Sequence, residues 1–549
     1  MSEQSERLFE AMSHISDEVV TEAEPGRFTV KKRRRWGRWA ALAACLVLAV
    51  GVARVLPFLG GAGGSAGGAG AGTDGSSVFM SYAGPVFPLD VLEGGESLTA
   101  RRHITLDFAP WVPVWVSNEQ QLDEAAAEGA SSAELTDYAA TLADRYPEGG
   151  YYARGDRLQV TDAYTLSNTA DRPVQATVLY PFAGSLRDLS ETLPDLTADG
   201  APVQATVHAG GYSGGFTGAG GVEDDLNLDQ LNGWEEYGAL LADGSYRAAA
   251  LADPPDLSGT PAVVYEFTDP WGPAEGEDAP NPTVQVWFDV DYEQVRVMSY
   301  GFHGGSYDAE GGRMGLSFSI RRPNEVNYGE PYYIILVGGD VSGMTTRVRV
   351  TGGWDEDTAV TEGGVTVRRI ETDLESALRT AARLDYGQRV NVWDGTDEES
   401  AGFERYFALM KEYLLSYGVL AEDPVGRYDN GWLDMLDFES VGRVFYLKAT
   451  VTVPANGQLT LTARLAKEPS YDYHCADTAN RGVSGYDMVT GLGSSLTFTG
   501  QEATLVDHGV VEILRQNFGF DPAAGVNTVT LDPAQEHYYL EVRRADSGD

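Results

Sequence analysis

The chain has 549 residues, of which 43% are hydrophobic and 22% charged, a composition that supports two to four folded domains and excludes a disordered chain. With 82 acidic against 39 basic residues the net charge is −43, so nucleic acid is not an expected partner. The two cysteines, Cys45 and Cys475, form neither a zinc motif nor a disulfide framework, and no cofactor is expected.

Residues 1–30 predict a cytoplasmic amphipathic helical segment. Apolar residues recur there at helical spacing, which indicates two short helices over about 4–14 and 17–24. So short a segment cannot bury both faces of its helices alone, so we expect it either to bind a cytoplasmic partner or to lie as a tail on the membrane surface or in disorder. The predicted partner face consists of Leu8, Phe9, Met12, Ile15, Val19 and Val20.

Residues 31–59 combine a basic flank with an apolar run, as a transmembrane helix does. From Trp39 to residue 59 the run has 21 residues, and about 20 span a bilayer core. The basic residues precede the run, which predicts a single-pass protein of the cell membrane with a cytoplasmic N-terminus and an extracytoplasmic body. The residues that flank or enter the lipid bilayer are Lys31, Lys32, Arg33, Arg34, Arg35, Trp36, Arg38, Trp39 and Arg54.

Two other interpretations of the apolar run stay open. A cleaved signal peptide would need a leader of 38 residues before its apolar part, longer than a whole typical signal of about 15–30 residues. Residues 42–45 (LAAC) match a lipoprotein attachment pattern, but apolar residues continue beyond Cys45, where a lipidated cysteine should end the segment. We therefore expect a permanent anchor.

Residues 8–24 (LFEAMSHISDEVVTEAE), with the basic run and RWAALAACLVLAV after them, resemble the start of a group of uncharacterised single-pass membrane proteins of clostridial bacteria. Such proteins look like anti-sigma factors of the extracytoplasmic-function type. The resemblance covers about 55 residues, a tenth of the chain, and implies that the cytoplasmic segment holds a sigma factor. The HxxxCxxC zinc signature of many anti-sigma domains is absent, since His14 is the only histidine before the apolar run.

Beyond the anchor, residues 60–77 are mostly Gly, Ala and Ser and predict a flexible linker. From residue 78 onward, short alternating segments bounded by Gly, Pro, Asn or Asp predict strands. Helical patterns interrupt them at about 119–145, 372–384, 400–417 and 508–517.

These segments predict a mainly β fold of tandem β-sandwich-like extracytoplasmic modules with inserted helices. Segments 294–308 and 458–472 align without a gap, and two further strand patterns follow each of them in the same order, which indicates two related β modules. The expected parts of the body are a first β region with a helical insert (78–345), a mixed α/β connecting region (346–435) and a second β module (436–549).

No catalytic or metal-binding pattern of the sequence meets its structural requirements. Residues 211–215 match GxSxG, but a nucleophile elbow needs a strand before it and a helix after it, and we expect a flexible loop there. Residues 225–236 resemble a calcium loop, but Gln230 occupies the position where the tight turn needs glycine, so a solvated acidic loop is expected. His474 and Cys475 have no second histidine nearby. We therefore predict that the chain is not an enzyme.

The sequence leaves two functions open. The first is an envelope-sensing, anti-sigma-like regulator, in which the outer body senses an unknown extracytoplasmic ligand and the cytoplasmic helices hold a regulator such as a sigma factor. The second is a surface binding or scaffold protein, in which the N-terminal segment serves topology alone.

Overall fold

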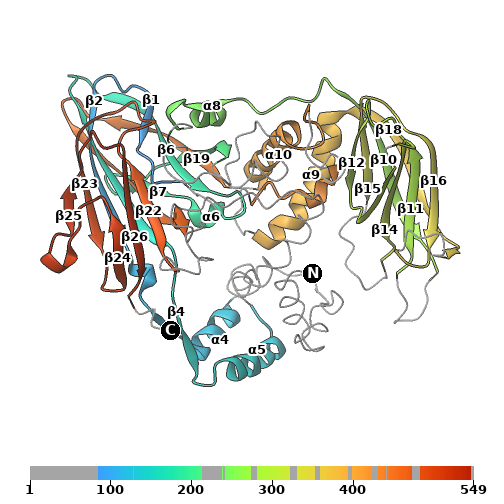
Figure 1. Ribbon diagram of the computed structural model, residues 1–549, viewed down its shortest axis with the longest axis horizontal. Coiled ribbons are helices and arrows are strands. Elements are labelled where there is room, and N and C mark those ends of the chain that lie inside the picture. Colours follow the sequence, from blue (N-terminus) through green and yellow to red (C-terminus); the bar gives the residue numbers. More distant parts are fainter. Residues whose placement is uncertain are drawn as a thin grey trace, which may run out of the picture. The chain divides into compact units, whose positions relative to one another are not determined.

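The computed structural model describes residues 84–545, apart from residues 128, 213–237, 239–240, 274–280, 309, 322–330, 353–358, 394–398, 423–430, 441 and 473–481. The described part of the chain is mainly β, as the sequence predicts (Figure 1). It forms two compact units. The smaller unit is Thr260–Ala377, and the larger unit combines the described segments before Thr260 and after Ala377.

These units do not coincide with the division expected from the sequence. The region 78–345 contributes to both units, and strands from the expected second module share sheets with strands from that first region. For example, β19 (Arg443–Val453) pairs with both β6 (Val174–Gly184) and β9 (Ala205–Tyr212). The smaller unit is therefore inserted between two segments of the larger one.

Two antiparallel sheets make up the smaller unit. One has the order β12 (Arg296–Tyr300), β15 (Tyr332–Val337), β10 (Pro261–Trp271) and β18 (Gly364–Asp373). The other has the order β13 (Gly304–Asp308), β14 (Arg313–Ser319), β11 (Thr283–Asp289), β16 (Ser342–Arg349) and β17 (Val360–Thr361).

Aromatic side chains pack between these two sheets. The ring of Phe318 on β14 stacks on that of Tyr332 on β15 with centroids 3.7 Å apart, and Phe302 contacts both rings. Phe267 on β10 meets Phe302 edge to face at 5.7 Å. Such rings bury large apolar areas and prefer offset or edge-to-face contacts, so they hold the two layers together. Tyr332 and Tyr333 are both buried.

The larger unit is built on a seven-stranded sheet. Its order is β25 (Thr528–Thr530), β23 (Thr497–Val506), β2 (Leu98–Asp107), β5 (Leu158–Asn168), β20 (Gln458–Lys467), β7 (Asp195–Ala198) and β8 (Ala201–Pro202). Two four-stranded sheets accompany it, one of β1 (Asp90–Glu93), β6, β19 and β9, and one of β21 (Tyr471–Asp472), β22 (Ser484–Val489), β26 (His537–Arg544) and β24 (Val511–Gln516).

One hydrophobic core joins these three sheets. Side chains along β5 alternate between buried and half-buried, as expected when one face of a strand lies on a core. The core contains residues of all three sheets, including Leu166, Val178 and Leu540, each with no exposed surface. Tyr538 on β26 belongs to this core, whereas Tyr539 is half-buried.

Helices occupy the connections. In the larger unit these include α4 (Asn118–Ala127), α5 (Ser132–Arg145), α6 (Leu189–Thr192), α8 (Ser245–Leu251) and α10 (Glu399–Ser416), with short 3-10 turns η1 (Ala109–Trp111), η4 (Leu433–Met435) and η5 (Pro522–Ala524). Helix α9 (Leu374–Trp393) crosses from the smaller unit into the larger one. The helical predictions at 119–145, 372–384 and 400–417 agree with α4 and α5, α9 and α10.

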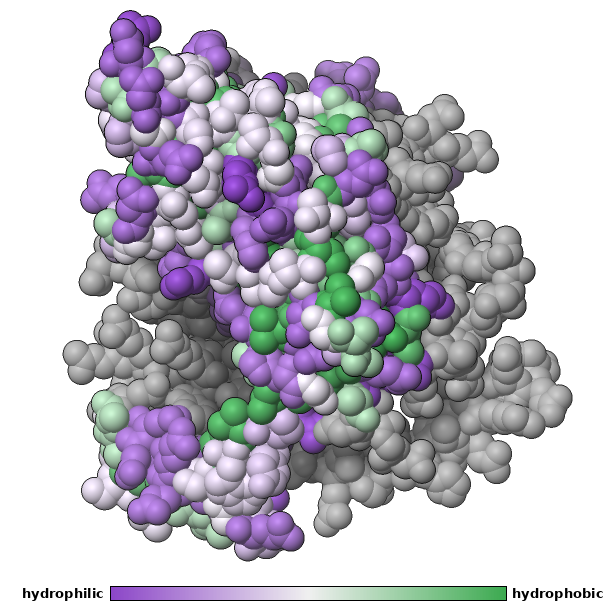
Figure 2. Space-filling view, turned by 90° about the vertical axis from the view of Figure 1, so that its left-hand side faces the viewer, coloured by the Kyte–Doolittle hydropathy of each residue, from purple (hydrophilic) through white to green (hydrophobic). Residues whose placement is uncertain are grey.

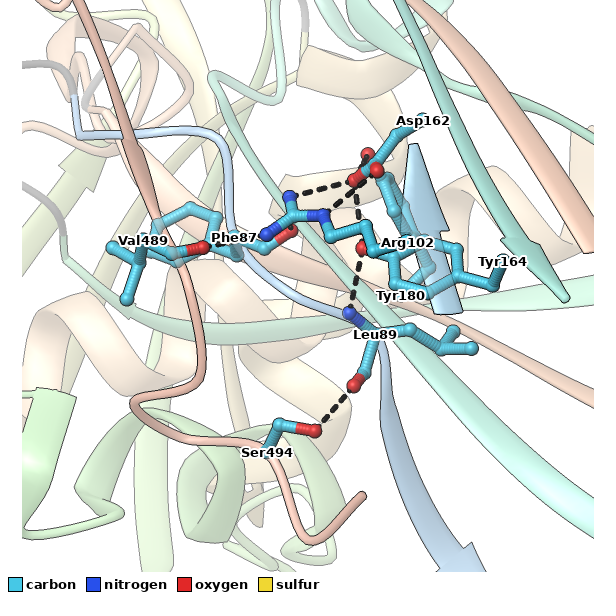
Figure 3. Close-up of polar contacts among 8 residues, drawn as sticks. All are labelled: Phe87, Leu89, Arg102, Asp162, Tyr164, Tyr180, Val489 and Ser494. Atoms are coloured by element: carbon cyan, nitrogen blue, oxygen red, sulfur yellow. Dashed lines mark hydrogen bonds and ion pairs between the residues drawn. The ribbon is translucent and has the colours of Figure 1, made fainter. Parts of the chain in front are cut away.

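A buried ion pair lies within the core of the larger unit (Figure 3). Arg102 on β2 and Asp162 on β5 have no side-chain exposure, and Nε and Nη2 of the arginine each donate to the carboxylate at 2.8 Å. Two tyrosine hydroxyls also donate to Oδ2 of Asp162, that of Tyr164 at 2.7 Å and that of Tyr180 at 3.4 Å. Burial raises the pKa of both tyrosines well above the ordinary value, so they remain donors.

This network fastens neighbouring segments to the sheet. Arg102 also donates to the carbonyls of Val489 at 2.6 Å and Phe87 at 3.1 Å, and Leu89 donates its backbone N–H to the Tyr164 hydroxyl at 3.0 Å. Each charge therefore has several hydrogen-bond partners, which a buried ion pair requires. The pair serves the architecture of the unit and is closed to solvent.

Two further sequence predictions differ from the structure. The helix predicted at 508–517 is wrong, because β24 occupies Val511–Gln516 and pairs with β26. The register of this pair shifts between Ile513 and Arg515, and such a bulge breaks the two-residue alternation by which a strand is recognised.

The two aligned segments also differ in pairing. Strand β12, from the first aligned segment, pairs with β15 in one sheet, whereas β20 and β26, their expected counterparts, lie in different sheets. The strand patterns are alike in composition, but this pairing is not repeated, so the proposed duplication has no support from topology.

Candidate functional site

The segment between η1 and β5 forms a small insert in the larger unit. It runs through β3 (Val114–Ser117), α4, α5 and β4 (Gly150–Ala153), and the two strands pair antiparallel. Figure 1 shows α4, α5 and β4 beyond one end of the sheets of the larger unit. The fold therefore sets this insert apart from the main core.

Contacts at its base fix the insert to the sheets. Trp111, at the end of η1, is buried and meets Phe108 and Tyr486 edge to face. The guanidinium of Arg544 lies 4.6 Å from the centre of the Trp111 ring and donates to the carbonyl of Gly155 at 2.7 Å. Both chain ends of the insert are thus held by one arginine of β26.

Local hydrogen bonds shape the helical part. Ser131 and Glu134 form a capping box at the start of α5, in which each side chain accepts a hydrogen bond from the other residue's backbone N–H. Such a pair marks the N-terminus of a helix. The side-chain amide of Asn118 donates to the carbonyls of Leu142 and Tyr146, at 3.2 and 3.1 Å, and so joins the start of α4 to the end of α5. These bonds fix α4 and α5 as an antiparallel helix pair.

Large apolar side chains of the two strands face solvent. Val114 is 61% exposed, Trp115 41% and Tyr152 64%. Val114 precedes Trp115 directly on the strand and therefore points to the opposite face, so we call Trp115 and Tyr152 the hairpin surface. Trp115 and Tyr152 are directly opposite in the pair, with ring centroids 5.1 Å apart and planes at 68°. A Cβ atom on Gly150 would lie 2.8 Å from Cζ2 of Trp115, so glycine at this position leaves room for the indole.

Acidic residues adjoin the hairpin surface. A solvent-open hollow of about 420 Å³ lies along α4 and is lined by Ser117, Glu119, Gln120, Asp123, Glu124 and Ala127. Ser117 is two residues after Trp115 on the same strand, so both side chains point to the same face. We call Glu119, Asp123 and Glu124 the acidic wall. In Figure 2 the insert lies at the bottom of the view, where the surface is mostly hydrophilic. Hydrophobic groups lie just above it.

Neither set of residues chosen from the N-terminal sequence falls in the described part of the chain. The predicted partner face of residues 8–20 and the membrane-flanking residues 31–54 lie outside it. The same holds for the calcium-like loop, for His474 and Cys475, and for Ser213 of the GxSxG motif. Within the described ranges, none of the helices has the length and apolar character needed to cross a membrane.

The beginning of the GxSxG motif is described and differs from the expected flexible loop. Gly211 and Tyr212 end strand β9. A Cβ on Gly211 would lie 2.6 Å from the ring of Tyr246 on α8, so the glycine permits close packing of helix on strand. Gly210 is equally tight, with the carbonyl oxygen of Val444 2.5 Å from a Cβ built on it. These glycines have a packing role.

No group of three or more histidine, cysteine, aspartate or glutamate side chains among the described residues could hold a metal ion. Two of the described histidines contact single carboxylates, His537 that of Asp487 at 2.8 Å and His508 that of Asp107 at 2.7 Å. The structural feature that the sequence reasoning missed is the hairpin surface. Its signal was a pair of short aromatic segments, VPVWV and GGYYA, on either side of the pattern at 119–145.

Comparisons of the chain with protein-family models, with curated proteins and with solved structures find no match.

Proposed function

We propose that the chain is a single-pass membrane protein whose acidic extracytoplasmic β body binds a ligand outside the cell. The exposed aromatic pair Trp115 and Tyr152 carries this proposal. Exposed apolar side chains that gather in one place mark interaction sites, whereas scattered ones do not. The aromatic residues lie on paired strands with a fixed base, so the surface is presented in one geometry.

The proposal also includes a membrane anchor and a body of β-sandwich modules. The apolar run of residues 39–59 holds the protein in the membrane, the linker of residues 60–77 separates the body from it, and both units are β-sandwich modules. The basic flank of residues 31–38 and the two layers joined by the rings of Phe318 and Tyr332 support these assignments.

Binding of envelope material tests the proposal. The full-length protein in lipid nanodiscs should retain a component of a cell-envelope extract, and the double variant Trp115→Ala/Tyr152→Ala should lose most of that retention. The matched control is Trp271→Ala, which removes a tryptophan of the smaller unit that is 58% exposed. Equal retention by the wild type and the double variant would refute the assignment of the surface.

The topology has a separate test. Sequencing of the mature N-terminus should find that residues 1–30 are retained in the mature protein. A mature protein that begins after residue 71, or one that begins at a lipidated Cys45, would refute the permanent anchor.

Signalling is the second candidate function. The apolar spacing of Leu8, Phe9 and Met12, on the side of the membrane opposite to the body, favours it. Residues 1–30 used as bait should then recover a sigma factor or another regulator, and deletion of residues 2–24 should change transcription. Unchanged transcription together with retained surface binding would favour the scaffold function instead.

A further inference from the structure

We infer that the partner of the hairpin surface is a cationic protein segment, whose lysine or arginine side chains contact the aromatic rings and reach the acidic wall. This inference rests on the proposed function, because it names the ligand class of the same site. It follows from three features of the insert: the geometry of the ring pair, the distribution of charge and the distance between the two.

The ring pair suits a cation on an aliphatic stem. Planes at 68° place the edge of one ring against the other, so the two side chains form a corner and not a flat platform for a sugar ring. An ammonium or guanidinium group is attracted to the face of a tryptophan or tyrosine within about 6 Å of its centre. The protein already uses this contact at the base of the insert, where Arg544 covers Trp111.

The charge of the insert selects the same class of ligand. Residues 112–155 contain eight acidic and two basic residues. Glu119 and Asp123 are four residues apart on α4, where like charges destabilise a helix, and Glu124 adjoins them. Among the described residues, no arginine, lysine or histidine forms an ion pair with any of the three carboxylates. A bound cation would relieve their repulsion.

The spacing fits one extended side chain. Trp115 and Ser117 are separated by two residues of strand, which is about 7 Å. The stem of a lysine or arginine can cover apolar surface while its charged end reaches solvent or a carboxylate. Such a stem can lie on the rings of Trp115 and Tyr152 while the charge enters the hollow beside Ser117. A second copy of this chain is disfavoured, because its net charge of −43 repels the acidic wall.

A labelled peptide tests the inference directly. The full-length protein in neutral-lipid nanodiscs is titrated with a fluorescent peptide of alternating lysine and alanine, followed by anisotropy at low and high salt. A peptide with glutamine in place of lysine and a neutral glucose oligosaccharide are the other probes. We expect binding of the lysine peptide that weakens with salt, because screening acts on exposed charges.

Two variants separate the contributions. Glu119→Gln/Asp123→Asn/Glu124→Gln should weaken peptide binding by about tenfold or more and flatten its salt dependence. Trp115→Ala/Tyr152→Ala should weaken it by about three- to thirtyfold and leave the salt dependence in place.

A control triple variant removes the same charge elsewhere. Glu96, Glu310 and Glu512 are exposed, and their joint replacement by glutamine should leave peptide binding unchanged. An equal loss in this control would show attraction by net charge alone and overturn the inference. Tighter binding of the oligosaccharide than of the lysine peptide would also overturn the inference.

The results also distinguish this inference from the proposed function. Retention of envelope material that depends on Trp115 and Tyr152, without binding of the lysine peptide, would overturn the cationic partner and keep the binding function. Retention that does not depend on these two residues would overturn the binding function itself.

Discussion

Replacement of Arg102 by methionine should destabilise the larger unit severely. The variant keeps the volume of the stem but leaves the carboxylate of Asp162, which has no exposed surface, without its positive partner. It also removes two hydrogen bonds to the carboxylate and those to the carbonyls of Phe87 and Val489. The remaining donors to Asp162 would be the hydroxyls of Tyr164 and Tyr180.

The size of the effect follows from this geometry. Removal of one partner from a buried ion pair costs about 3–5 kcal/mol, because an uncompensated charge stays inside the core. Replacement of both partners, as in Arg102→Met/Asp162→Leu, removes the stranded charge. The double variant should therefore lose less than the sum of the single variants Arg102→Met and Asp162→Leu, by on the order of 3 kcal/mol.

Urea unfolding of residues 78–549, followed by tryptophan fluorescence, measures these differences through the midpoint and slope of the transition. Arg101 offers a matched control on the same strand. It faces outward with 69% side-chain exposure and lies 4.0 Å from Glu502, so Arg101→Met should cost less than about 1 kcal/mol. A loss below about 1 kcal/mol for Arg102→Met, or equal losses in the two variants, would refute the reasoning.

Three further predictions concern single positions. Burial lowers the pKa of Lys467 to about 8, an effect partly offset by Asp487 and Glu468. Because the unfolded chain binds more protons at this group between pH 8 and 10.5, the contribution of Lys467 to stability should rise by about 3 kcal/mol across that window. The measurement is the difference in stability between the wild type and Lys467→Met in urea titrations at several pH values, and a difference that does not change with pH would contradict the prediction. Gly94 has a φ of +76°, and a Cβ added to it would meet the carbonyl oxygen of Gln175, so Gly94→Ala should lower the free energy of unfolding by more than 1 kcal/mol. Gly200 has a φ of +82° with open space around it, so Gly200→Ala should cost about 1 kcal/mol. Equal losses in the two variants would contradict the role of the Gln175 contact. Ser131→Ala should cost about 1 kcal/mol by loss of the cap and speed amide exchange in α5; unchanged exchange would count against it.

The strand content could be predicted from the sequence, because a strand with one buried face alternates apolar and polar residues with a period of two. Strand β5 shows this, with every second residue buried along its whole length. Strand β24 shows the limit, since its bulge between Ile513 and Arg515 removes the alternation and imitates helical spacing. The division into units failed for a different reason. Pairings such as β6 with β19 join segments more than two hundred residues apart, and local patterns carry no information about them.

The two charged residues of the buried ion pair stand out in the sequence, but the sequence does not show that they pair. Arg102 lies between Ala100 and Ile104 on the inward face of β2, and Asp162 occupies an equivalent inward position on β5. Charged residues at such positions are rarely buried unless they are paired. Their partnership depends on the register of the two strands, which the sequence does not specify. The hairpin surface was missed because its strands have only four residues each and exposed aromatic side chains.

The parallel pairing of β2 with β23 has a consequence for the order of synthesis. The hydroxyl of Thr499 donates to the carbonyl of Ala100, which lies 399 residues earlier. During synthesis from the N-terminus, β2 has to wait for nearly the whole chain before this neighbour exists, while the smaller unit can fold within that interval. Nascent or truncated chains that end before residue 497 expose one edge of β2 to other chains, and open strand edges promote aggregation. Strand β23 therefore covers this edge of β2 and removes one site at which other chains could pair with it.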